Sequence, residues 1–202
     1  MVHKCTSRCM FRMVYLSPSF TFSLFVYIDA VSLVPSPDSK IIKEGVAIHF
    51  AEKGLNVWFI SPSVLDNIPA NIVPPDKEIL QLITFIYLKD CKDLLNHLNT
   101  IHLWHKSPTV ILICGFDIYT NIFEENYKPM LAALLSTTLL DSSVVCYKKN
   151  KKSTYLILTL QTIPDNYRDR IKVLYDMYFP NIITDQHEEI VIDKVVNYYI
   201  NK

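Results

Sequence analysis

The chain has 202 residues, half of them apolar, and its 20 Lys and Arg residues balance its 20 Asp and Glu residues. This length fits one domain with a sizeable core, and the zero net charge excludes binding of nucleic acid through overall charge, leaving only a local patch or a partner. Only 3 residues are glycine, against a usual share of about 7%. This scarcity disfavours the glycine-rich loops that bring backbone N–H groups close to phosphates.

The N-terminal residues 1–34 start basic and continue as an apolar run, as a signal peptide or membrane anchor would. Pro18 and Asp29 interrupt that run, which falls short of the roughly 18 clean apolar residues of a membrane span. We therefore predict a buried strand near its end. Residues 1–20 match nothing that follows and are predicted to be disordered or an unreliable gene model, which leaves residues 21–202 as a single domain.

Helices and strands alternate through the next part of the chain. Residues 40–53 predict a helix that ends at Gly54, and residues 56–61 predict a buried strand. The proline-rich segment 62–75 predicts a loop. Residues 77–88 begin as a helix and end as a strand.

An amphipathic pattern over residues 89–104 predicts another helix, with Asp90 as its N-cap. Residues 109–117, "TVILICGFD", form the clearest buried-strand pattern in the chain. Pro129 then stands at the first turn of a long apolar helix, where proline is tolerated.

Two further strands, residues 142–149 and 153–161, are predicted to form a hairpin around the basic sequence "KKNKK". Residues 165–179 predict a helix, and residues 181–202 fit a strand or a helix equally well. The order of elements predicts an α/β fold: a mainly parallel sheet with helices on both faces and an antiparallel hairpin at one edge.

The five cysteines are an odd number, and Cys91, Cys114 and Cys146 fall in apolar segments. This pattern predicts reduced, buried thiols in an intracellular protein. Cys5 and Cys9 have no second pair at ligand spacing, so we expect no metal site.

The segment "SLVPSPDSKIIKEG", residues 32–45, occupies the place of a phosphate loop, between a strand and a helix. The signature of such a loop is G-x-x-x-x-G-K-[ST]. With Lys40 as the lysine, Val34 and Ser39 replace the two glycines and Ile41 replaces the Mg²⁺-binding hydroxyl. A second requirement fails as well, because the strand "VILIC" ends in Cys114 where an Asp should orient the Mg²⁺.

Four strings resemble RecA-like recombinase paralogues, and most closely the SWIM-domain-associated ATPase family. Together they span roughly residues 40–180, most of the chain, and read "AIHFAEKGLNVWFISPSVLDNIP", "LITFIYLKDCKDLLNHLNTIH", "PTVILICGFDIYT" and "LYDMYFP". The resemblance implies a RecA-like, P-loop-NTPase-type core. It also implies a nuclear accessory factor of homologous-recombination DNA repair, with a SWIM zinc-finger protein, recombinase-type proteins and single-stranded DNA as partners and no membrane.

Carried onto this sequence, the resemblance implies a vestigial nucleotide site, with residues Ser36, Ser39, Lys40, Ile41, Cys114 and Asp117. Without Mg²⁺ ligands, little stabilises a transferring phosphoryl group, so ATPase activity is doubtful and no catalytic residue is assigned. The cofactor is then none, or ATP with Mg²⁺ held weakly. A first exon that replaces the true phosphate loop would explain the same residues.

The one dense basic run contains Lys148, Lys149, Lys151 and Lys152. A solvated hairpin tip is the preferred interpretation. The alternative is contact with the backbone of single-stranded DNA, with Tyr147 or Tyr155 available to stack on a base.

Two other functions remain open from the sequence. One is an active DNA-dependent ATPase of the same fold, which requires Lys40 to hold phosphates without the glycines. The other is a membrane-anchored or secreted α/β protein, suggested by the apolar residues 10–34.

Overall fold

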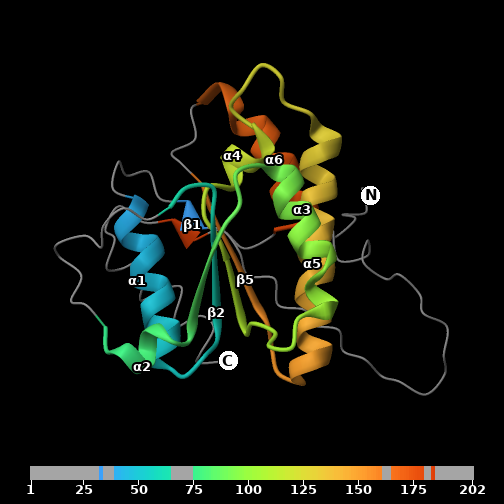
Figure 1. Cartoon of the computed structure of the whole chain (residues 1–202). Helices are drawn as coiled ribbons and strands as arrows, with labels where there is room; N and C mark the ends of the chain where they lie inside the picture. Colours follow the sequence, from blue (N-terminus) through green and yellow to red (C-terminus); the bar gives the residue numbers. More distant parts are fainter. Residues whose placement is uncertain (1–31, 34–38, 65–74, 161–164, 180–182, 185–202) are drawn as a thin grey trace, which may run out of the picture.

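A computed structural model describes residues 32–33, 39–64, 75–160, 165–179 and 183–184. For residues 32–33, 39–44, 165, 175 and 183–184 it describes the backbone alone. Four strands form an all-parallel sheet with helices on both faces (Figure 1). The predicted α/β class is therefore confirmed.

The sheet has the strand order β3-β2-β4-β5-β1-β6, and every strand pair in the described chain is parallel. The four longer strands are β2 (Val57–Ser61), β3 (Ile83–Tyr87), β4 (Val110–Ile113) and β5 (Tyr155–Leu160). Two-residue strands extend the sheet beyond β5, namely β1 (Ser32–Leu33) and β6 (Ile183–Thr184).

Helices connect the strands. The α-helices are α1 (Ser39–Glu52), α2 (Lys77–Leu80), α3 (Cys91–Asn99), α4 (Phe116–Thr120), α5 (Pro129–Asn150) and α6 (Arg168–Met177). Two short 3-10 helices are η1 (Ile101–Leu103) and η2 (Asp165–Tyr167). Helix α1 covers one face of the sheet, and α3, α5 and α6 cover the other (Figure 1).

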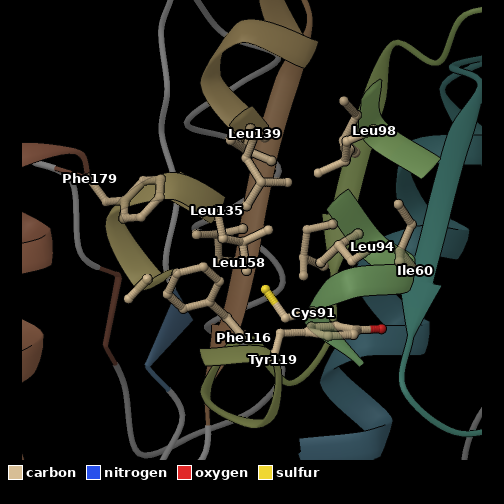
Figure 2. Packing of buried hydrophobic residues seen from close by; sticks show 14 of the residues in the cluster. Ile60, Cys91, Leu94, Leu98, Phe116, Tyr119, Leu135, Leu139, Leu158 and Phe179 are labelled. Atoms are coloured by element: carbon tan, nitrogen blue, oxygen red, sulfur yellow. The ribbon is translucent and has the colours of Figure 1, made fainter. Parts of the chain in front are cut away.

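Alternating strand residues supply the two cores. On one face, Phe59 and Leu112 pack with Phe50 of α1. On the other face, Ile60 and Ile113 pack with α3 and α5, and leucines from both helices converge on the sheet (Figure 2). Because both faces are covered there, β2, β4 and β5 are apolar at nearly every position, with Ser61 and Thr159 as the exceptions.

Several predicted helix boundaries are confirmed. Gly54 follows α1 with φ +77°, in the left-handed region that glycine adopts without steric cost. The side chain of Asp90 caps α3 by accepting a hydrogen bond from the Asp93 N–H at 2.9 Å. Pro129 lies in the first turn of α5.

The predicted hairpin is wrong. Residues 142–149 form the last two turns of α5, and the chain then enters β5, which pairs in parallel with β4. Ser142, Ser143 and Cys146 are buried and continue the inward face of the helix begun by its leucines. This long buried face overrides the strand preference of the β-branched residues within the segment.

The strand predicted over residues 109–117 is shorter than expected. It ends at Ile113, Gly115 turns the chain with φ +73°, and α4 begins at Phe116. Asp117, which we expected in a loop, therefore lies in the first turn of α4.

Helix α5 is the one described helix that is long and apolar enough to cross a membrane, by length and composition only. Its inward residues pack against the sheet and α3, so core packing accounts for much of that apolar character. The apolar residues 10–34, which suggested an anchor, lie outside the described residues.

Candidate functional site

The carboxyl ends of the parallel strands meet at one edge of the sheet, and the described residues that flank positions 34–38 lie there. Strand β1 ends at Leu33 and α1 begins at Ser39. From β1 the chain passes to α1 on one face, whereas from the neighbouring β5 it passes to α6 on the other face. In open α/β sheets, ligands bind in the crevice at such a switch point.

The sequence-predicted residues of this segment are only partly visible. Ser36 lies outside the described residues, and Ser39, Lys40 and Ile41 are described as the backbone of the first turn of α1. The first N–H groups of a helix lack intrahelical partners and carry the positive end of its dipole. The backbone at this edge therefore has the form of an anion site.

Cys114 directly follows β4 and is 2% exposed. It belongs to the buried cluster that joins α1 to the sheet, so it lies on the α1 face. Only β5 separates β4 from β1, a span of about 10 Å at the usual strand spacing. The resemblance predicted this position for an Mg²⁺-orienting acid, but Mg²⁺ prefers oxygen ligands and a thiol in an apolar core supplies none.

Asp117 lies in the first turn of α4, just after β4. It is 4% exposed in α4, and the neighbouring Phe116 and Tyr119 belong to the cluster on the face opposite α1. Asp117 engages partners within the protein. Cys114 and the helix that carries Asp117 thus pack on opposite faces of the sheet.

Sequence reasoning missed two hydroxyls at this edge. Thr159 near the end of β5 donates a hydrogen bond to the Ile113 carbonyl at 3.5 Å and accepts one from the Gly115 N–H at 3.4 Å. Ser61 at the end of β2 accepts a hydrogen bond from the Ser63 N–H at 3.4 Å. The sequence feature that could have identified them is a single Ser or Thr near the end of each apolar run.

The three cysteines of the core are buried thiols, as predicted. Burial raises the pKa of Cys91, with the Asp90 carboxylate adding to the shift, and burial raises the pKa of Cys146 to about 12. These thiols therefore stay protonated and unreactive near neutral pH. No group of three His, Cys, Asp or Glu residues in the described chain could hold a metal ion.

The basic run lies at the other end of the sheet, between a helix and a strand and not at the predicted hairpin tip. Lys148 and Lys149 stand in the last turn of α5, and Lys151 and Lys152 follow before the start of β5. The Lys149 ammonium donates hydrogen bonds to the carbonyls of His102, at 3.1 Å, and Trp104. Lys149 therefore connects the end of α5 to η1 and to the residue that follows η1.

The two tyrosines named as stacking partners differ. Tyr147 is exposed on α5. Tyr155 packs on the opposite face, with its ring stacked against Phe50 of α1 at 6.2 Å, and burial raises its pKa. Tyr155 is therefore a core residue on the α1 side, away from α5.

No family model matches the sequence, and no curated protein matches it either.

Proposed function

We propose that this chain is a degenerate RecA-like accessory subunit of homologous-recombination DNA repair that acts through partner proteins in the nucleus. The observation that carries the proposal is the buried Cys114, which stands at the end of the strand where a nucleotide site would present its Mg²⁺-orienting acid. The four strings that resemble the SWIM-domain-associated ATPase family support the same assignment.

The fold is consistent with a P-loop-type core. A helix, α1, starts at the carboxyl edge directly after a strand, and it starts at a switch point of a parallel sheet. The chemistry of phosphoryl transfer is weakened there, because Ile41 and Cys114 replace both protein ligands of Mg²⁺. At most, Lys40 and the first turn of α1 hold a phosphate weakly.

The surface supports a role through partners. Met130, which is 83% exposed, and Leu134 lie one helical turn apart on the outer side of α5. Val173 and Met177 are exposed on α6, which packs beside α5. Exposed apolar side chains on two adjacent helices suit contact with another protein, here a SWIM zinc-finger protein or a recombinase.

Co-purification with a tagged SWIM zinc-finger protein tests this proposal. We expect the wild-type chain to be retained, and the double variant Met130→Glu and Leu134→Glu to lose at least about ten-fold in retention, because it places charges in an apolar contact. The matched control is Lys89→Glu with Lys92→Glu, exposed residues near the start of α3.

A chain that stays monomeric and ignores every SWIM and recombinase partner would overturn the proposal. If the α5 variant and the wild type were retained equally, the partner protein would bind a different face of the chain.

A second candidate function is an active DNA-dependent ATPase of the same fold. The observation in its favour is the start of α1 at the switch point, with Lys40 in its first turn. The buried thiol at residue 114 weighs against it.

A further inference from the structure

The end of α5 and the segment between η1 and β4 are tied together at the amino-terminal end of the sheet. Besides the two bonds from Lys149, the Asn150 side chain donates hydrogen bonds to the carbonyls of Ser107, at 3.3 Å, and Pro108, at 2.9 Å. Two segments more than 40 residues apart in the sequence therefore form one continuous surface.

The two segments that form this surface are basic. Residues 94–116 and 142–164 contain no Asp or Glu, and together they carry Lys106 and the four lysines of the basic run. Asp141 is the nearest acid along α5, and it lies about 10 Å before Lys148 at the helical rise. Five lysines thus lie on two segments that contribute no acid of their own, on a chain of zero net charge.

Interaction with the end of α5 accounts for only some of these lysines. Lys148 and Lys149 complement the negative end of the α5 dipole, and Lys149 is bound to carbonyls. Lys106 and Lys152 lie outside the helix and are exposed, and no helix end requires them.

One of these two segments also carries an exposed aromatic ring. Trp104 is 41% exposed. It meets the buried Trp58 edge-on, with centroids 5.4 Å apart and planes at 71°, and His97 at 5.1 Å and 62°. Lys149 holds its backbone carbonyl. Because these neighbours fix the ring, stacking of another ring on it costs little additional conformational entropy.

We propose that this surface binds single-stranded nucleic acid, with phosphates at Lys106, Lys148 and Lys152 and a base stacked on Trp104. The inference rests on the proposed function, which supplies its biological context. The basic residues that we predicted at a hairpin tip belong instead to a surface whose residues are defined. A base must be unpaired to stack on Trp104, which favours single strands over a duplex. The site lies at the opposite end of the strands from α1's first turn, so binding is independent of nucleotide.

Fluorescence anisotropy of a labelled oligodeoxythymidine over a salt series tests the proposal. The double variant K106A with K152A should bind with a weaker dependence on salt. The slope of the logarithm of the binding constant against the logarithm of the salt concentration should fall in magnitude by about 0.7 for each lost phosphate contact. Trp104→Ala should weaken binding about ten-fold, and Trp104→Phe should restore most of it, since phenylalanine still stacks. The control K89A with K92A, at the other end of the sheet, should bind as wild type.

Absence of binding, an equal loss in the K89A/K92A control, preference for duplex DNA, or tighter binding to phosphatidylserine vesicles would each overturn the inference. Thermal melting identifies any unfolding caused by Trp104→Ala, and the lysine variants test the site without touching the aromatic cluster. Co-purification of the same variants with the SWIM partner separates the two proposals, because loss of DNA binding alone leaves partner binding intact.

Discussion

Replacing Cys114 by Asp is expected to destabilise the protein by about 3–5 kcal/mol, the range found for an uncompensated buried charge. Cys114 is fully enclosed by the cluster of α1, β2 and β4, which includes Ala47, Phe50 and Phe59. A carboxylate there loses its hydration among apolar side chains. Urea unfolding of the wild type and the variant measures the difference.

Cys114→Ala is the matched control, because it removes the thiol without introducing charge and should cost far less. The same pair of variants distinguishes the two functions proposed for the fold. If the carboxyl edge were a working Mg²⁺ site, the added Asp would be tolerated and stability would rise with Mg²⁺. Unchanged stability of the Asp variant would contradict a buried, apolar position.

Replacing Leu94 by Ala is expected to cost about 2–5 kcal/mol, the usual range for a large-to-small change in a well-packed core. Leu94 is fully buried and points from α3 toward the sheet, near Ile60 (Figure 2). The helices around it are fixed by the strands and by Asp90 at the start of α3, so the cavity cannot close easily. Thermal or urea unfolding gives the value.

Leu103→Ala serves as the control for the core variant, because Leu103 is 67% exposed on η1. It should change the free energy of unfolding by less than about 0.5 kcal/mol. Similar losses for both variants would mean that α3 does not pack on the sheet as described.

Short-range signals predicted much of the fold. Gly54 and Asp90 indicated where a helix ends and where one begins, and apolar runs indicated β2 and β4. These predictions succeeded because each feature acts over only a few residues. The hairpin failed because the strand preference of residues 142–149 is local, whereas the buried face of α5 depends on packing along a 22-residue helix.

The site was predicted less completely. The position of Cys114 followed from the spacing of a known signature, and its burial agrees with a core role. The cluster of Trp58, His97 and Trp104 could not be predicted, since its members come from three separate elements and meet only through tertiary packing. The same holds for the carbonyls bound by Lys149.

Titration calorimetry with ATP and Mg²⁺, run on the wild type and on Lys40→Ala, tests most directly whether this fold has lost nucleotide chemistry. We expect no heat that depends on Mg²⁺ and no release of phosphate, because neither Ile41 nor Cys114 can ligate the metal. Weak binding that is independent of Mg²⁺ and lost in Lys40→Ala would fit a surviving anion site. Mg²⁺-dependent binding with ATP hydrolysis, abolished by Lys40→Ala, would contradict the account.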